Sequence, residues 1–224
     1  MMKKLLLLQA FFTLGLSLFA QADSSRIAPG AQDRLASLLN KPAMVNHATA
    51  TPLGRNWFKL ETDAHIFTDQ VSLKQVAAVL LDLDNQDKFL DGKKSKLTTK
   101  VVSRGADEII ADFVSISIAP LGIQIRTPYR ASIRTVENTT SRFSLEVRQL
   151  PDDSASNKDI KNLFATRYAE EVTINGKKYT YIRIYTVNEV NASVLPGAKN
   201  TLERNSFPIN EEVLHMIIDA AKTK

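Results

Sequence analysis

The sequence contains no cysteine, and this absence excludes several kinds of chemistry at once. Without a thiol the chain forms no disulfide, offers no thiolate ligand to a metal and has no cysteine nucleophile. It also cannot be anchored by a lipid on a cysteine at the start of a mature chain. The stability of the fold therefore has to come from a hydrophobic core.

Histidine is scarce, and the common catalytic motifs are missing. His47, His65 and His215 have no metal-ligand spacing among themselves or with acidic residues. The Gly-x-Ser-x-Gly turn of hydrolases and the glycine-rich loops that bind phosphate are absent. We expect no metal site, no cofactor and no catalytic residue that the sequence alone identifies.

Only one apolar run is long, and it covers residues 5–20. Lys3 and Lys4 precede this run, and Ala-Gln-Ala at 20–22 gives the small-x-small pattern that signal peptidase needs. The pattern predicts a signal peptide over residues 1–22 and a periplasmic or secreted protein. An uncleaved anchor is the alternative, although the run is slightly short for a membrane span.

The chain without residues 1–22 would be 202 residues long, which is enough for one domain with a substantial core. Its formal net charge would fall from +5 to +3 with the loss of Lys3 and Lys4. So small a positive excess gives only a weak preference for anionic surfaces, such as transient contact with an anionic membrane. We expect no nucleic-acid partner.

Residues 23–56 are predicted to lead into the main domain. Apolar residues recur at helical spacing from Ile27 to Leu39, which predicts a short helix. The stretch from there to Asn56 has little periodicity and is interpreted as a loop.

The clearest helix signal follows a first strand predicted over residues 57–67. Ser72 and Gln75 form a capping box, in which each side chain bonds the other residue's backbone amide. The apolar stripe behind it consists of Val76, Val79, Leu80 and Leu83.

Turn signals divide the next hundred residues into antiparallel strands with one buried face. Alternation is cleanest over residues 123–136, where Ile125 and Tyr129 share a face opposite Arg126 and Arg130. In the last strand, tyrosines and isoleucines compete for the inner face. The predicted strands cover residues 97–103, 108–118, 123–136, 142–148, 163–174 and 178–190.

A final helix has a broad apolar face. Pro208 either kinks this helix or moves its start to about Asn210. Asn210 followed by Glu211 and Glu212 would suit a helix start, with a capping side chain and acids near the positive end of the helix dipole.

Several stretches of the sequence match a known family. They are Ser72 to Val76 with Leu80-Leu81-Asp82, Asp84 to Leu90, and Leu195-Pro196-Gly197 with Asn200. Together with the element order, they resemble the helix-grip fold of the START-like, polyketide-cyclase/dehydrase superfamily (SRPBCC), here as an exported bacterial member. The resemblance covers about residues 57–222. Asp91 departs from it, since many members have proline there, and so does Phe207-Pro208.

The resemblance implies an α+β domain in which a curved antiparallel sheet of about six to seven strands wraps around the long C-terminal helix. Space between sheet and helix would form a mostly apolar pocket. The same side chains could instead fill the centre and leave no cavity. The expected lining is Ile123, Ile125, Tyr129, Phe143, Leu145, Val147, Val213, Met216 and Ile217.

Three functions stay open. The first is binding or carriage of a hydrophobic, lipid-like molecule. The second is a non-catalytic interaction module that uses a sheet edge or the basic stripe of Arg126, Arg130 and Arg134. The third is a cyclase/dehydratase-type enzyme, for which Asp112 and Tyr129 are the only candidates, and a local twist or bulge would turn Asp112 outward.

Overall fold

The computed structural model of the protein describes residues 39–40, 43–44, 48–118, 124–151, 159–193, 195 and 197–224. The predicted signal peptide, nearly all of the predicted helix between Ile27 and Leu39, and the turn before residue 124 lie outside the described residues.

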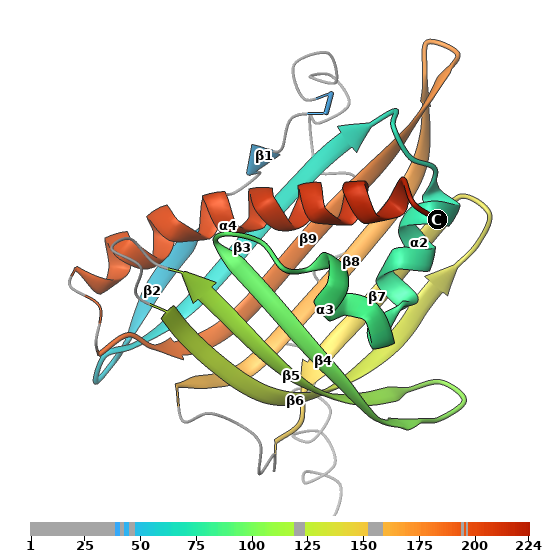
Figure 1. The fold of residues 1–224 in the computed structure, drawn as a ribbon. Coiled ribbons are helices and arrows are strands. Elements are labelled where there is room, and N and C mark those ends of the chain that lie inside the picture. The colour runs from blue at the N-terminus through green and yellow to red at the C-terminus, as the bar shows by residue number, and fades with distance from the viewer. Residues whose placement is uncertain are drawn as a thin grey trace, which may run out of the picture.

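One antiparallel sheet forms most of the described structure (Figure 1). Its nine strands follow the order β1-β3-β9-β8-β7-β6-β5-β4, with β2 also paired to β3. In Figure 1 the helix α4 lies across β3, β9 and β8, and the strands β4 to β6 curl round beside it. The strands are β1 (Ala43–Met44), β2 (Thr49–Gly54), β3 (Trp57–Thr68), β4 (Ser95–Arg104), β5 (Ile109–Ile118), β6 (Gln124–Asn138), β7 (Arg142–Gln149), β8 (Ile160–Ile174) and β9 (Lys177–Asn191).

The predicted strand number of six to seven is too low, because the segment interpreted as a loop contributes two strands. β1 pairs with His65 and Ala64 of β3, and β2 pairs with the first part of the same strand, residues 57–61. Backbone hydrogen bonds rather than a periodic apolar pattern place these residues in the sheet, so the sequence carried little signal for them.

The helix after β3 begins as the capping box predicts. The Ser72 amide donates to Gln75 Oε1 at 2.9 Å, and the Gln75 amide donates to Ser72 Oγ at 3.4 Å. This helix, α2 (Leu73–Leu81), buries Val76, Val79 and Leu80 of the predicted apolar stripe, and the fourth residue, Leu83, is buried just beyond its end. Two short helical segments follow α2: η2 (Leu83–Asn85) and α3 (Gln86–Phe89).

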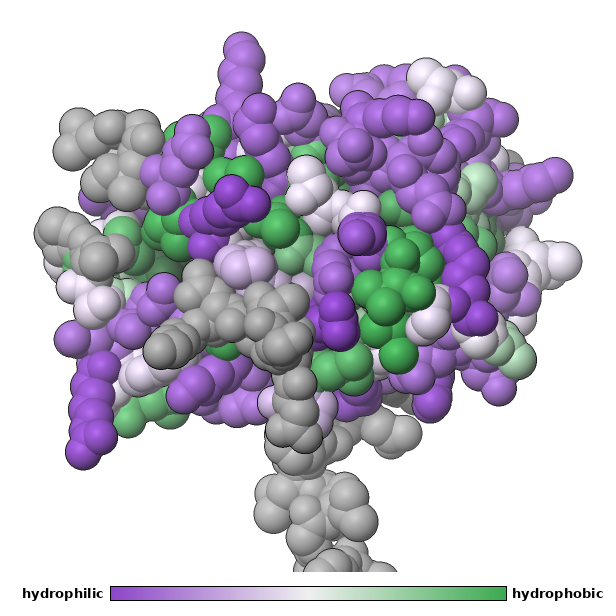
Figure 2. Space-filling view, turned by 60° about the horizontal axis from the view of Figure 1, so that its bottom comes forward, coloured by the Kyte–Doolittle hydropathy of each residue, from purple (hydrophilic) through white to green (hydrophobic). Residues whose placement is uncertain are grey.

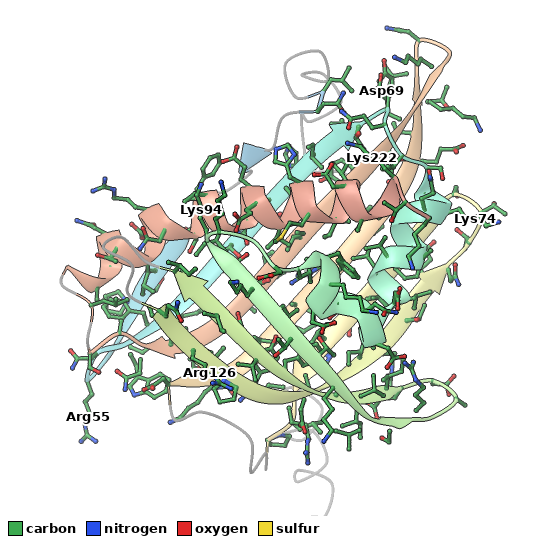
Figure 3. The ribbon with its side chains drawn as sticks, in the orientation of Figure 1. Arg55, Asp69, Lys74, Lys94, Arg126 and Lys222 are labelled. Atoms are coloured by element: carbon green, nitrogen blue, oxygen red, sulfur yellow. The ribbon has the colours of Figure 1, made fainter. Side chains whose placement is uncertain are left out.

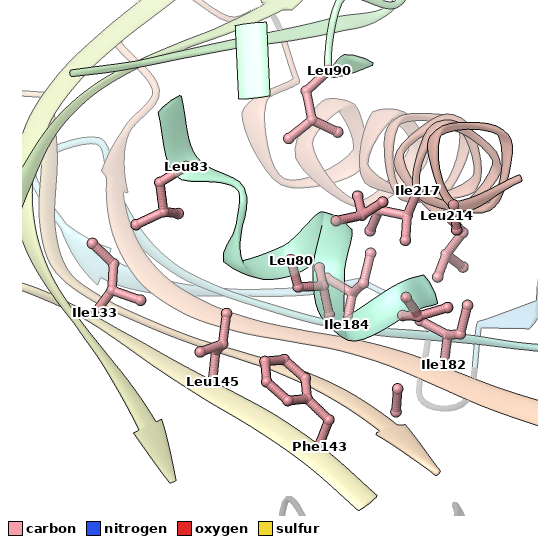
Figure 4. Close-up of a cluster of buried hydrophobic side chains, with 14 of the residues drawn as sticks. Leu80, Leu83, Leu90, Ile133, Phe143, Leu145, Ile182, Ile184, Leu214 and Ile217 are labelled. Carbon is pink, nitrogen blue, oxygen red and sulfur yellow. The ribbon is translucent and has the colours of Figure 1, made fainter. Parts of the chain in front are cut away.

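The inner face of the sheet carries the main core. In β9 the isoleucines, not the tyrosines, face inward. Ile182 and Ile184 are each 1% exposed and belong to this core. Figure 4 shows them facing Leu214 and Ile217 of α4. Burial of each such side chain contributes about 1.5–3 kcal/mol relative to exposure.

The outer face carries a second, aromatic cluster. It consists of Phe67, Tyr168, Val172 and Tyr181, all buried. The Tyr168 hydroxyl donates to Glu170 at 2.7 Å, so the one polar atom of this buried ring is satisfied.

The C-terminal helix α4 (Ala198–Ala221) runs through Pro208, and the predicted start near Asn210 is wrong. Gly197 precedes the helix with φ of 57°, a left-handed conformation that glycine adopts without steric cost. Proline inside a helix costs about 3 kcal/mol through the lost hydrogen bond and a ring clash. Contacts on both sides of Pro208 offset this cost: Glu203 accepts the Ala50 amide at 3.0 Å, and Leu214 is fully buried.

Glu212 of α4 fixes the loop that leads into β4. Its carboxylate accepts the backbone amides of Lys93, Lys94 and Ser95 at 2.8, 2.8 and 2.9 Å. At Gly92 any Cβ would overlap this carboxylate, which explains a glycine where the chain passes α4. No helix among the described residues is long and apolar enough to cross a membrane.

Candidate ligand-binding cavity

A cavity of about 330 Å³ lies between the inner face of the sheet and α4. Strands β3 to β9, the three short helical segments α2, η2 and α3, and α4 all contribute to its wall. The volume lies near the lower end of the range of roughly 300–1,000 Å³ that is usual for small-molecule pockets. The predicted alternative of a filled centre therefore does not describe this core.

Most of the residues expected at the pocket do line it. Within β6 and β7, alternation brings them to the inner face, as predicted. The six that line the cavity are Ile125, Tyr129, Leu145, Val147, Val213 and Ile217.

Two of the other three expected residues, Phe143 and Met216, are absent from the described cavity wall. Phe143 shares a face with Leu145 but is 1% exposed and packed into the solid core. Met216 packs against the same core from α4. Ile123 lies outside the described residues.

Tyr129 is the aromatic part of the wall that also carries a polar atom. Its ring stacks on Phe113 of the neighbouring strand with centroids 5.1 Å apart and an interplanar angle of 17°. Burial raises the pKa of the Tyr129 hydroxyl to about 12, and the positive charge of Arg167 opposes this rise. The hydroxyl is therefore neutral at physiological pH and can donate or accept one hydrogen bond.

Two asparagine side chains bring unpartnered polar atoms to the same cavity. Asn188 Oδ1 and Asn210 Nδ2 are buried without a hydrogen-bond partner among the described residues. Both residues line the cavity, one from β9 and one from α4. An unpaired buried polar atom costs about 1–3 kcal/mol, so a ligand that bonds these atoms would gain affinity.

Among the described residues, three with charged side chains line the cavity, and they differ in their surroundings. Lys96 forms an ion pair with Asp91 at 2.6 Å, and its side chain is 43% exposed. Asp159 is exposed. Arg167 lies on the inner face of β8, opposite Leu145 on one side and Ile184 on the other.

Arg167 is in an apolar environment although it carries a charge. Burial lowers the pKa of its guanidinium, and Tyr129 opposes this. The side chain of Arg167 nevertheless keeps some accessible surface, because it borders the cavity. A guanidinium stays protonated in proteins, so a positive charge faces the cavity.

Asp112, a candidate acid for an enzyme, points to the outer face. Its two oxygens accept from Arg130 Nε at 2.6 Å and Nη2 at 3.0 Å. The hydrogen bond from Arg130 holds the pKa of this carboxyl below its usual value. Asp112 therefore cannot act as a base inside the cavity, and this agrees with the outward alternative.

The predicted basic stripe lies on the outer face of β6. Arg126, labelled in Figure 3, and Arg134 are exposed, while Arg130 between them binds Asp112. In the face viewed in Figure 2, hydrophilic side chains predominate and apolar ones form separate patches between them. Within the described ranges, no three acidic or histidine side chains gather as a metal site would require.

Arg167, Asn188 and Asn210 were not among the residues predicted to line the pocket. Leu163, Ala165 and Ala169 alternate with Arg167 on one face, but the larger Phe164 and Tyr168 occupy the opposite face and hide the signal. A polar residue in phase with small apolar ones is the pattern that could have identified Arg167.

No family model and no curated protein matches the sequence. A solved structure from Thermus thermophilus is similar, with a TM-score of 0.51 and 13% identity over 73% of this chain and 97% of that chain. A conserved protein from Geobacillus kaustophilus gives a TM-score of 0.47 and 15% identity over 73% and 95% of the two chains. A STAR-related lipid transfer protein from Xanthomonas axonopodis gives a TM-score of 0.44 and 10% identity over 76% of this chain and 99% of that chain.

At such identities the likeness concerns the fold alone. The element order, the curved antiparallel sheet and the C-terminal helix across it define a START-like helix-grip fold. The fold class implied by the sequence resemblance is confirmed.

Proposed function

We propose that this protein is exported and carries a hydrophobic small molecule in the cavity between the sheet and α4. The cavity itself is the observation that supports the proposal: about 330 Å³ of space in the centre of the fold, with a largely apolar wall. A protein that needed only a stable core would gain by filling this space, because cavities in cores are destabilising.

The two alternatives have less support. An interaction module needs no cavity, and its proposed basic stripe has its central arginine bound to Asp112. An enzyme needs a reactive acid or base at the cavity, and of its two candidates only Tyr129 faces inward, with its pKa raised rather than brought toward neutrality.

A pair of identical substitutions tests the location of binding. Val213 lines the cavity, whereas Val136 of β6 is 55% exposed. We expect Val213→Phe to fill part of the cavity and weaken binding of the uncharged fluorescent probe N-phenyl-1-naphthylamine by about tenfold or more. Val136→Phe serves as the control and should bind the probe like the unchanged protein.

The measurement uses protein purified from cells that express the whole sequence, after extraction of bound lipid. Circular dichroism establishes that both variants are folded. A folded Val213→Phe protein that binds the probe as tightly as the Val136→Phe control would refute binding in this cavity.

A further inference from the structure

We infer that the cavity holds an amphipathic molecule with a single apolar chain and a carboxylate head, and that Arg167 binds this head. The inference rests on the proposed function and adds the chemical class of the ligand. It starts from a cation in the cavity wall for which the described residues supply no anion.

The hydrogen bonds of Arg167 involve one of its three nitrogen atoms. Nη1 donates to the backbone carbonyl of Thr166 at 3.1 Å and approaches the Thr186 hydroxyl at 3.5 Å. A guanidinium has five N–H donors, and three of them belong to Nε and Nη2. Neither atom has a hydrogen-bond or ion-pair partner within the part of the chain that the structure describes.

Two other arginines of the same sheet show what this edge of a guanidinium binds. Arg130 donates from Nε and Nη2 to the two oxygens of Asp112, at 2.6 and 3.0 Å. Arg183 does the same to Asp63, at 2.8 and 2.5 Å. Both pairs lie on the outer face, where the protein supplies the carboxylate.

On the inner face the protein supplies none beside Arg167. Its neighbours across the sheet, Leu145 and Ile184, are 3% and 1% exposed and apolar. A charge in such surroundings is costly unless an anion pairs with it. A ligand carboxylate could accept hydrogen bonds from Nε and Nη2 of Arg167, as Asp63 accepts them from Arg183.

The balance of charge favours a carboxylate over a phosphate monoester. A phosphate monoester carries about −1.5 to −2 charges at pH 7, whereas a carboxylate carries one. Among the described residues that line the cavity, Arg167 is the one cation without a carboxylate partner, because Lys96 is paired with Asp91. The small volume of about 330 Å³ favours one chain over the two of a diacyl lipid.

Three ligands of equal chain length and two variants test the inference. Dodecanoate, 1-dodecanol and dodecyl phosphate compete against the uncharged probe on delipidated protein at pH 7.5. Arg167→Met removes the charge and keeps a flexible apolar chain of similar length. Arg134→Met, at an exposed position on the outer face of β6, is the matched control.

We expect the unchanged protein and Arg134→Met to bind dodecanoate about tenfold to a hundredfold more tightly than 1-dodecanol, since a hydrogen bond to a charged group contributes this much. Arg167→Met should lose this preference through weaker binding of dodecanoate, while its affinity for 1-dodecanol is kept. Retained binding of the alcohol also shows that the variant is folded.

Equal affinity for acid and alcohol in the unchanged protein, or an unaltered preference in Arg167→Met, would overturn the inference and leave carriage of a neutral molecule standing. Tighter binding of dodecyl phosphate than of dodecanoate would overturn the assignment of a carboxylate. If the probe and all three ligands fail to bind, the proposed function itself is refuted.

Discussion

Replacement of Glu212 by alanine should release the loop before β4 from α4. The carboxylate accepts three backbone amides, from Lys93, Lys94 and Ser95. Ser95 also lines the cavity, so this contact links the helix to the rim of the proposed binding site.

The size of the effect follows from the exposure of the three amides. Lys93 and Lys94 are exposed, so water replaces the carboxylate at their amides when it is removed. Ser95 is 8% exposed, and its amide would lose a bond to a charged group, which contributes about 1.5–3 kcal/mol. We therefore expect Glu212→Ala to lower the free energy of unfolding by about 2 kcal/mol, and Tm by about 4–8 °C for a protein of this size.

Thermal and urea unfolding followed by circular dichroism measure this loss. Glu211→Ala is the control, because the neighbouring carboxylate makes no hydrogen bond or ion pair to the residues that the structure describes. Its effect should stay within about 0.5 kcal/mol. Equal stability of the two variants would show that Glu212 does not hold the loop.

Two further stability measurements test the polar interactions of the fold. Asp63 is 1% exposed and binds Arg183 through both oxygens. Asp63→Asn should therefore lower the free energy of unfolding, measured in urea, by about 3–5 kcal/mol. A loss below about 1 kcal/mol would contradict a stabilising buried ion pair. The folded pKa of Tyr129, about 12, lies above the ordinary value of 10, so the folded state keeps a proton that the unfolded state releases. On the alkaline side, stability should therefore fall as pH rises from 10 to 12. Tyr129 accounts for about 2–3 kcal/mol of that fall, and Tyr129→Phe should remove this part; an unchanged pH profile would be inconsistent with a buried hydroxyl.

The fold could be predicted where local signals and tertiary structure agree. Ser72 and Gln75 form the capping box that the sequence indicates, and the alternation of β6 places Ile125 and Tyr129 inward. Asn-Gly is a strong sequence signal for a two-residue hairpin turn, and Asn175 and Gly176 have φ of 52° and 76°, as such a turn requires. In each case the signal comes from a few adjacent residues whose conformation does not depend on distant contacts.

Prediction failed where distant contacts decide the structure. The run from Thr49 to Gly54 has no strand pattern, and its pairing with β3 makes it a strand. Asn210 has the local features of a helix start, but α4 begins at Ala198. Contacts distant in the sequence hold both halves of the helix: Glu203 accepts the Ala50 amide of β2, and Leu214 is buried.

In the candidate site, too, local sequence patterns predict some residues, whereas distant contacts decide the role of others. Strand alternation and helical spacing indicate apolar residues of the inner face, and six of the nine expected residues line the cavity. Arg167 was missed because its significance depends on what is absent around it: a carboxylate that Arg130 and Arg183 find on the outer face. Sequence alternation places a residue on a face but does not state which partners it meets there.

Native mass spectrometry of the purified protein, before and after gentle extraction with organic solvent, tests the central claim most directly. A carrier should retain an apolar molecule, so the spectrum should show a bound species that extraction removes, and rebinding of dodecanoate should restore a one-to-one adduct. A spectrum of the bare chain before extraction, with no adduct after addition of dodecanoate or 1-dodecanol, would contradict carriage of a hydrophobic ligand in this cavity.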